Sequence, residues 1–257
     1  MVTIRELVAC LETSGLHPEG FKWPKGISVL KDFFGHTIRP SAGPLSMLQQ
    51  IRRIKQKHFH LNLIRVGSEP MQDKEQLINN ALYHLREIYA TVALGVGRVR
   101  HRYIPVDEAK GYDIIECDAE AEDLTNEWTV SNDGLDIFIV LHRWWETGEG
   151  WHAGKATEDG PCNKNNSFFY TGCVVSLRGT GKRTSYILGH EIGHYLGLPH
   201  IYDLESDDVD EPDEIADLPS DAKSNMMFPR ANGSKLKWWQ GVEMKKHCFV
   251  HSGCRIT

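Results

Sequence analysis

The sequence has no apolar run long enough to cross a membrane. Its longest such run, from Leu135 to Leu141, contains Asp136 and falls far short of the roughly 20 residues that a membrane-spanning helix needs. Residues 1–15 place Arg5 and Glu6 within a helical pattern and have no long apolar core, unlike a signal peptide. We therefore expect no membrane partner. The compartment stays open between the cytoplasm and secretion by a route that the sequence does not show.

Positive charge is also in short supply. The chain carries 29 Lys and Arg against 35 Asp and Glu, which gives a formal net charge of −6. A nucleic-acid-binding protein normally needs a basic face, so we expect no nucleic-acid partner. The sequence has no internal repeat and no biased tract apart from one acidic stretch. Its 257 residues suffice for one substantial globular unit, whose oligomeric state is left open.

Cysteine amounts to only six residues. The even number suits disulfides, and Cys162 with Cys173 and Cys248 with Cys254 are near enough in sequence to close short loops. Free thiols would be equally ordinary at this count. We take these two disulfides as the expectation and free thiols as the alternative.

The hydrophobic pattern changes near residue 58. Residues 1–57 combine a short helix, a stretch punctuated by Gly and Pro, and a basic helix. They predict an N-terminal helical segment that is a propeptide, an accessory segment or a part of the fold. Residues 58–257 alternate between strand and helix periodicity, which predicts an α/β domain. The expected strands cover residues 60–66, 97–106, 135–141 and 168–177, and the expected helices cover residues 73–94 and 184–198.

The segment that carries chemistry runs from His190 to His200 and reads HEIGHYLGLPH. Residues four apart share one face of a helix, so His190 and His194 can direct ring nitrogens at one ion. Glu191 is adjacent to the first histidine and can reach a water on that ion. Gly197 stands where the helix must end, because glycine tolerates the left-handed backbone of a sharp turn, and the turn returns His200 as third ligand. Three neutral imidazoles with one open position are typical of a catalytic zinc site.

This segment resembles the metzincin consensus HExxHxxGxxH. Metzincins also have a methionine turn, a tight turn that forms an apolar floor beneath the metal. The segment SNMMFP over residues 224–229 is its counterpart, with Met227 as the floor residue and Met226 as the alternative register. The resemblance covers about residues 58–257. It implies a twisted mixed sheet with a backing helix, an active-site helix, and a smaller irregular C-terminal subdomain with the Met-turn and a final helix over residues 235–247.

The subfamily is left open between two resemblances. The Phe-Pro pair after Met227 resembles the matrixins, whereas Asn225 and the long insert after His200 resemble the pappalysins. No tyrosine follows either methionine by two residues, so the tyrosine ligand of astacins and serralysins is absent. Residues 1–57 contain no matrixin-like cysteine switch, because Cys10 lacks that context.

The resemblance implies a zinc-dependent endopeptidase with one zinc ion, a protein or peptide substrate and Glu191 as general base. Residues 171–177, directly before the active-site helix, are expected at the edge of the sheet, where an extended peptide adds through main-chain bonds without needing a free terminus. The alternatives are a zinc-containing binding module or pseudo-protease without hydrolysis, and a gluzincin with Glu211 or Glu214 as third ligand. The expected peptide-binding residues are Thr171, Gly172, Cys173 and Val174.

An acidic stretch lies between the third histidine and the expected Met-turn. It holds ten acidic residues and no Lys or Arg. Clustered carboxylates are ligands for Ca²⁺, but their spacing does not match an EF-hand loop. A solvated acidic loop is the main expectation, with Ca²⁺ binding or attraction of basic substrates as alternatives. The ten residues are Asp203, Glu205, Asp207, Asp208, Asp210, Glu211, Asp213, Glu214, Asp217 and Asp221.

Overall fold

The computed structural model of the protein describes seven parts of the chain. These are residues 57–67, 74–143, 153–165, 170–177, 179–201, 220–229 and 233–252. The predicted N-terminal helical segment before Lys57 lies outside the described residues, as do residues 203–219 of the acidic stretch. Cys10 and Cys254 also lie outside them, and the predictions for the N-terminal segment, the acidic stretch and Cys10 stay predictions.

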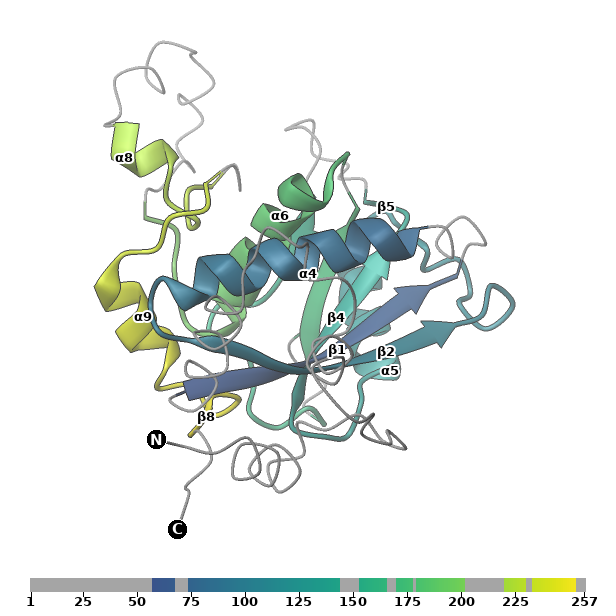
Figure 1. Cartoon of the computed structure of the whole chain (residues 1–257). Coiled ribbons are helices and arrows are strands. Elements are labelled where there is room, and N and C mark those ends of the chain that lie inside the picture. The colour runs from purple at the N-terminus through teal and green to yellow at the C-terminus, as the bar shows by residue number, and fades with distance from the viewer. Residues whose placement is uncertain are drawn as a thin grey trace, which may run out of the picture.

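The described elements alternate between strands and helices, which confirms the expected α/β class (Figure 1). Helices α5 and α8 and the short strands β3, β5, β6 and β8 are not among the predicted elements, and the final helix is shorter than expected. The strands are β1 (Lys57–Val66), β2 (Gly95–Ile104), β3 (Ile114–Ile115), β4 (Gly134–Val140), β5 (His142–Arg143), β6 (Gly154–Lys155), β7 (Gly172–Ser176) and β8 (His251–Ser252). The helices are α4 (Glu75–Ala90), α5 (Asp118–Glu127), α6 (Gly181–Tyr195), α8 (Ser220–Lys223) and α9 (Trp238–Met244).

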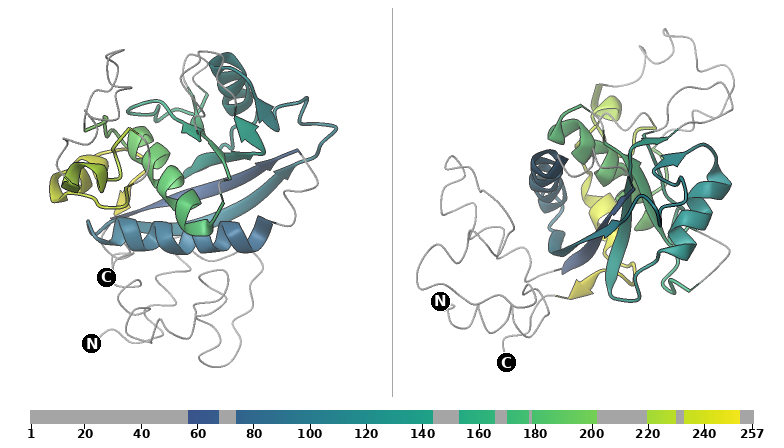
Figure 2. Two further views of the ribbon diagram at one scale, coloured as in Figure 1. Left: turned by 90° about the horizontal axis from the view of Figure 1, so that it is seen from above. Right: turned by 90° about the vertical axis from the view of Figure 1, so that its right-hand side faces the viewer.

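The central sheet has the strand order β2-β1-β4-β7-β6, and β8 pairs with the beginning of β1. Strands β2, β1, β4 and β7 are parallel, whereas β6 and β8 pair antiparallel with their neighbours. Helices α4 and α6 cover one face of the sheet and α5 covers the other (Figure 2). Because both faces are covered, every residue of β4 is buried, as its continuous apolar run predicts.

The larger core lies between the sheet and helices α4 and α6. The apolar stripe predicted for α4 is confirmed, since residues from Ile78 to Tyr89 at helical spacing are buried there. At the end of this stripe the Tyr89 hydroxyl donates a hydrogen bond of 2.9 Å to the Gly189 carbonyl of α6. The backing helix is thereby tied directly to the helix that carries the histidine motif.

The expectation that residues 171–177 form the edge of the sheet is wrong. Strand β7 pairs with β4 on one side and with β6 on the other, so β6 is the outermost strand of the described sheet. In β6, Gly154 pairs with Val175 and Lys155 with Val174. The resemblance points to the segment directly before the active-site helix, whereas a strand of two residues is too short to show a period of two in the sequence.

Both expected disulfides are also wrong. Cys162 is bonded to Cys248, 86 residues further along the chain. Cys173 is a buried free thiol on β7, and its side chain belongs to the core shared with α6. The pairing is thus determined by where the chain returns in space and not by the length of the intervening segment.

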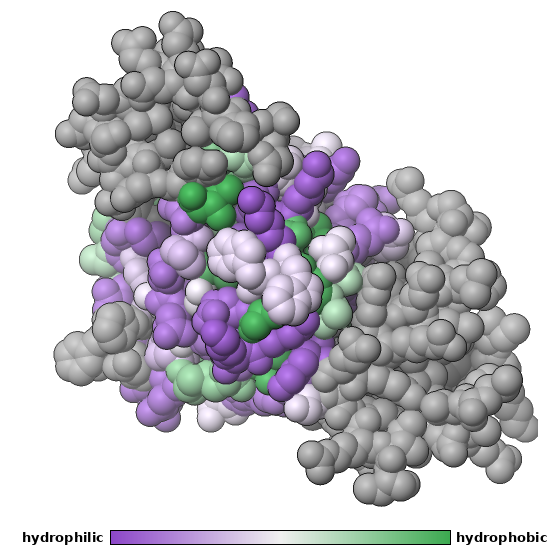
Figure 3. All heavy atoms as spheres, turned by 90° about the vertical axis from the view of Figure 1, so that its left-hand side faces the viewer, coloured by the Kyte–Doolittle hydropathy of each residue, from purple (hydrophilic) through white to green (hydrophobic). Residues whose placement is uncertain are grey.

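Among the described residues no helix is both long enough and apolar enough to cross a membrane. The face that carries α9 is covered mostly by hydrophilic and intermediate side chains, with apolar residues scattered among them (Figure 3). Trp238 and Trp239, at the beginning of α9, are the most exposed aromatic residues that the structure describes, at 78% and 48%.

Candidate metal centre

Helix α6 begins and ends at residues that the sequence marks. The Thr180 side chain accepts a hydrogen bond from a backbone N–H of the first turn, as an N-cap residue does. At the other end Gly197 has φ +91°, which confirms the predicted left-handed turn. The Leu198 N–H donates to the Gly193 carbonyl at 2.9 Å and the Gly197 N–H to the His194 carbonyl at 2.8 Å, the two bonds of a Schellman motif.

This turn brings the three predicted ligands together. The Nε2 atoms of His190 and His194 lie 3.0 Å apart, and His200 Nε2 lies 3.1 Å from each of them. Four-coordinate zinc with Zn–N bonds of 2.0–2.1 Å separates its nitrogen ligands by roughly 3.3 Å. The three nitrogens therefore already have almost the spacing of a tetrahedral metal site.

The hydrogen bonds of the other ring nitrogens show which atoms carry protons. His190 Nδ1 lies 2.7 Å from the Met226 carbonyl, and His194 Nδ1 lies 2.8 Å from the Leu198 carbonyl. A carbonyl only accepts, so in both neutral rings the proton is on Nδ1 and Nε2 presents a lone pair. Lone pairs that converge within 3.0 Å repel one another unless a cation lies between them. This donor set fits a metal ion, and outer carbonyls that orient ligating histidines are usual in metal sites.

His190 and His194 are also held in the neutral form that binds metal. Burial lowers the pKa of His190 to about 4, although its hydrogen bond to Met226 opposes the shift. Burial and the neighbouring His190 and His200 lower the pKa of His194 to about 3. Both rings are therefore unprotonated at neutral pH.

Glu191 is buried on the same helix, with 6% of its surface exposed. Its side chain lies against Gly154 of the outermost strand β6: a Cβ atom on Gly154 would lie 2.5 Å from Glu191 Oε1. Beneath the helix, the Cys173 thiol donates a weak hydrogen bond of 3.5 Å to the Glu191 carbonyl. Sequence reasoning missed Gly154, because a single glycine in a short strand carries no recognisable signal.

The Met-turn is held by a pair of side-chain amides. Asn225 Nδ2 donates to Gln240 Oε1 at 3.0 Å, and Gln240 Nε2 donates back to Asn225 Oδ1 at 3.1 Å. Asn225 Oδ1 also accepts the Met227 N–H at 2.9 Å, which fixes the backbone of the turn. The sequence indicated Asn225 through the family resemblance, but Gln240 has no signal of its own.

Both candidate floor methionines are fully buried against α6. Met226 Sδ lies 2.7 Å from the position of a Cβ on Gly189, and Met227 Sδ lies 2.5 Å from that on Gly193. Two glycines four residues apart therefore let the Met-turn approach the helix closely. The preference for Met227 over Met226 as the floor residue stays a prediction.

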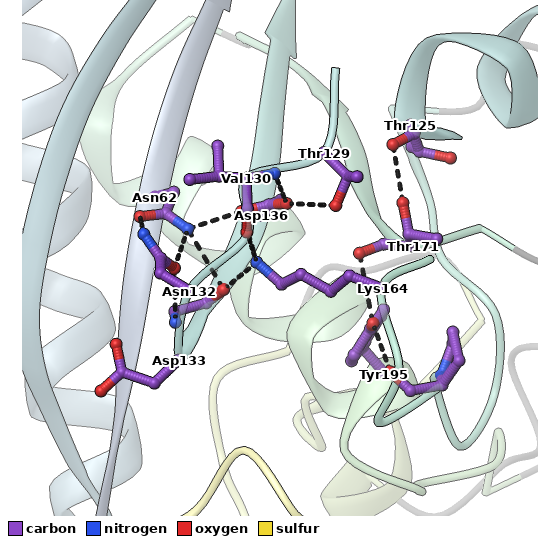
Figure 4. A network of polar contacts seen from close by, with 12 residues as sticks. Asn62, Thr125, Thr129, Val130, Asn132, Asp133, Asp136, Lys164, Thr171 and Tyr195 are labelled. Carbon is purple, nitrogen blue, oxygen red and sulfur yellow. Dashed lines mark hydrogen bonds and ion pairs between the residues drawn. The ribbon is translucent and has the colours of Figure 1, made fainter. Parts of the chain in front are cut away.

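A buried polar network holds the loop that follows β6 (Figure 4). The Lys164 ammonium lies 2.8 Å from Asp136 Oδ1 and also donates to the Val130 and Gly134 carbonyls. Further along, the Tyr195 hydroxyl lies within 3.1–3.2 Å of the carbonyls of Pro161 and Thr171. With the Cys162–Cys248 disulfide, these contacts attach the loop to the sheet, to α6 and to the C-terminal segment.

The structure does not bring the expected peptide-binding residues to the surface. The Thr171 hydroxyl donates to the Thr125 carbonyl at 2.6 Å, and residues 171–174 are all buried. Thr171 and Val174 pack toward α5 and Cys173 packs toward α6, so these side chains belong to the two cores, and their role in peptide binding stays a prediction. The gluzincin alternative is disfavoured because His200 occupies the third ligand position, while Glu211 and Glu214 lie outside the described residues.

A second group of side chains with metal-binding atoms lies where β8 meets β1. It comprises His60, Asp133 and His251. His60 Nδ1 accepts the Arg98 backbone N–H at 3.1 Å, so the proton of the neutral ring is on Nε2, 3.5 Å from the Asp133 carboxylate. His251 Nε2 lies 3.3 Å from the Asp133 carbonyl and must donate to it. Both nitrogens of His60 are committed, so His60 offers no lone pair to a metal ion, and the group as a whole does not fit one.

The comparison with known proteins agrees with this site. The family model Peptidase_M43, described as "Pregnancy-associated plasma protein-A", matches residues 146–247, less than half of the 257-residue chain. The matched segment contains the three histidines, Glu191 and the Met-turn. It supports a metalloprotease of the metzincin type, and of the two resemblances it favours the pappalysins.

Two other comparisons add little. No curated protein matches the chain. Among solved structures, metalloproteinase-II from Bacteroides fragilis is similar over 74% of this chain and 53% of that chain, with 15% identity and a TM-score of 0.44. The chain thus spans about half the length of that structure, and a likeness this low does not bear on function.

Proposed function

We propose that the protein is a zinc-dependent endopeptidase in which His190, His194 and His200 hold one zinc ion and Glu191 is the general base. The observation that carries the proposal is the convergence of three Nε2 atoms within 3.0–3.1 Å. The Nδ1 protons of His190 and His194 are donated away from this point, to carbonyls. Three histidines and an open position are the ligand set of a catalytic zinc rather than of a closed structural one.

When bound, zinc supplies a Lewis acid that polarises the scissile carbonyl and makes a water molecule more acidic. Glu191 accepts the proton of that water and delivers it to the leaving amine. Its burial beside Gly154 excludes bulk water from the carboxylate and limits the directions in which it can point. The amide pair of Asn225 and Gln240 keeps the Met-turn, and with it the Met226 carbonyl, in place to orient His190.

The substrate in this proposal is an extended segment of a protein or peptide. Strand β6 is the outermost strand of the described sheet and lies next to Glu191 through Gly154. A peptide that adds to this edge through main-chain hydrogen bonds lies beside the strand residue that contacts Glu191. Because such binding needs no free terminus, it favours cleavage within a chain.

The experiment that tests the proposal compares the wild type with Glu191→Gln, which keeps the size of the side chain. Cleavage of denatured casein is followed by gel electrophoresis, and bound zinc is measured by elemental analysis. Both proteins are expected to hold about one zinc, because Glu191 is not a ligand, and only the wild type should cleave casein until a chelator is added.

Two results would count against the proposal. If Glu191→Gln cleaves as fast as the wild type, Glu191 is not the base. If the wild type holds zinc and cleaves no denatured protein, including after removal of residues 1–57, the binding-module or pseudo-protease alternative takes precedence.

A further inference from the structure

A residue with no side chain, Gly154, lies against the side chain of the proposed general base. A Cβ atom on Gly154 would lie 2.5 Å from both Cγ and Oε1 of Glu191 and 2.7 Å from its Cδ. Optimal separations between such carbon atoms are roughly 3.5–4.0 Å. Any residue other than glycine at position 154 therefore displaces the Glu191 side chain from where it lies.

The strand that carries Gly154 is held firmly on both sides of this residue. Gly154 pairs with Val175 and Lys155 pairs with Val174 of β7. The Ala153 carbonyl accepts both the Ser176 N–H at 2.9 Å and the Ser176 hydroxyl at 3.1 Å. The backbone at position 154 is therefore much harder to move than the end of the Glu191 side chain, which turns about three torsions.

We propose that Gly154 is a positioning residue: the absence of its side chain sets the place of the Glu191 carboxylate beside the metal. This inference rests on the proposed function, in which Glu191 is the general base. Since the atoms in its way belong to a flexible side chain, a methyl group at position 154 costs little folding free energy but moves the carboxylate. A misplacement of about 1 Å in a catalytic group can lower the rate roughly 100-fold.

A different glycine shows what a purely structural effect looks like. A Cβ atom on Gly241 of α9 would lie 2.5 Å from Val92 Cβ and 3.1 Å from the Val92 carbonyl, atoms that cannot turn away. Gly241→Ala should therefore lower the melting temperature. Gly111 has no atom within 4 Å of its Cβ position, but its φ of +89° makes alanine strained there. Gly111→Ala is therefore the control for a glycine replacement that strains the backbone and has no contact with the site.

The kinetic test uses a peptide that spans a casein cleavage site. Gly154→Ala is expected to lower kcat about 100-fold with KM changed less than about threefold, while zinc content and melting temperature stay near wild-type values. Gly111→Ala should leave kcat unchanged. An unchanged kcat in Gly154→Ala overturns the inference. So does a fall in kcat accompanied by loss of zinc or by a large fall in melting temperature, since the effect is then structural.

A spectroscopic test needs no substrate. In the cobalt-substituted protein, a carboxylate beside the metal affects the pH midpoint at which the visible absorption spectrum changes. This midpoint should shift in Gly154→Ala toward that of Glu191→Ala, and the double variant should match Glu191→Ala alone. A shift caused by Gly154→Ala in the Glu191→Ala background would overturn the inference, because the residue would then act by another route. If no substrate is cleaved but these midpoints hold, the proposed function fails and the positioning role stands.

Discussion

Two groups of histidines in the described part of the chain are built from the same kind of side chain. At the end of α6, the Nδ1 atoms of His190 and His194 donate to carbonyls and leave Nε2 lone pairs that converge. Where β8 meets β1, His60 Nδ1 instead accepts an N–H, and its Nε2 must carry the proton. Proximity alone would assign a metal to both groups. The direction of the hydrogen bond at the remote nitrogen separates them.

The two groups of histidines also differ in the charges beside them. The carboxylate of Asp133 is bound by the Arg98 guanidinium, so one cation already lies beside the His60 group. The pKa of His60 is lowered to about 3 by burial and then by Arg98, which resembles the lowered pKa values at the active-site helix. A lowered histidine pKa therefore marks burial in both places and does not by itself identify a metal ligand.

The largest expected difference between the groups concerns zinc itself. His194→Ala should lower zinc affinity by more than about 100-fold and abolish cleavage, because it removes a direct ligand. His251→Ala, the matched change in the other group, should leave one zinc per chain. Elemental analysis after dialysis measures both. Two zinc ions in the wild type, with one lost in His251→Ala, would contradict the distinction drawn from the hydrogen bonds.

Removal of the metal should lower the stability of the protein only when the histidines of α6 can bind it. Zinc at about 1,000 times its dissociation constant stabilises the folded state by about 4 kcal/mol, and a chelator should remove this stabilisation. The fall in melting temperature on adding chelator should be equal in the wild type and in His251→Ala, and absent in His194→Ala. A chelator effect that persists in His194→Ala would place the metal elsewhere.

A smaller effect on zinc affinity is expected from Asn225, which contacts the Met-turn and is not a proposed ligand. Asn225→Ala removes the acceptor of the Met227 N–H and breaks the amide pair with Gln240, all of them buried. We expect a loss of about 2–3 kcal/mol in the free energy of unfolding and a roughly 10-fold fall in zinc affinity, because the Met226 carbonyl that orients His190 shifts. Chemical denaturation and zinc titration measure the two effects. A loss of stability with unchanged zinc affinity would show that the turn is not coupled to the ligand.

The smallest expected effect belongs to His60 and depends on pH. Because the pKa of His60 is lowered to about 3 on folding, the unfolded chain binds the extra proton first. This stabilising contribution is complete above pH 6.5 and is lost as the pH falls from 6.5 toward 3. At pH 5 the loss is about 2 kcal/mol from this group. His60→Gln keeps one acceptor and one donor but does not titrate. Between pH 7 and pH 5 its free energy of unfolding, measured by urea denaturation, should therefore fall by about 2 kcal/mol less than that of the wild type. An equal loss in both proteins would contradict the assignment.

The sequence predicts more of the candidate metal site than of the fold around it. The three histidines and Gly197 lie within eleven consecutive residues, where helix periodicity and one glycine turn determine their geometry. The long elements α4 and β4 also follow from their apolar patterns. By contrast, the Cys162–Cys248 bond depends on where distant segments meet, which no local pattern encodes.

The functional residues that the sequence does not indicate were missed for a similar reason. The roles of Gly154, Gln240 and His60 arise from a single neighbour far away in the sequence: Glu191, Asn225 and the backbone of Arg98. Each contact is made across two elements whose arrangement must be known first. Sequence patterns describe what a residue does within its own element, and these three act between elements.

The Cys162–Cys248 disulfide makes a covalent ring of the chain segment that contains every proposed zinc ligand and the Met-turn. A single backbone cut within that ring leaves one molecule, because its two parts remain joined through sulfur. A cut between His200 and Met226 would therefore leave the ligand histidines and the floor methionine on parts that are still linked. Such a nicked protease would run as one intact band on a non-reducing gel and separate into two fragments only after reduction.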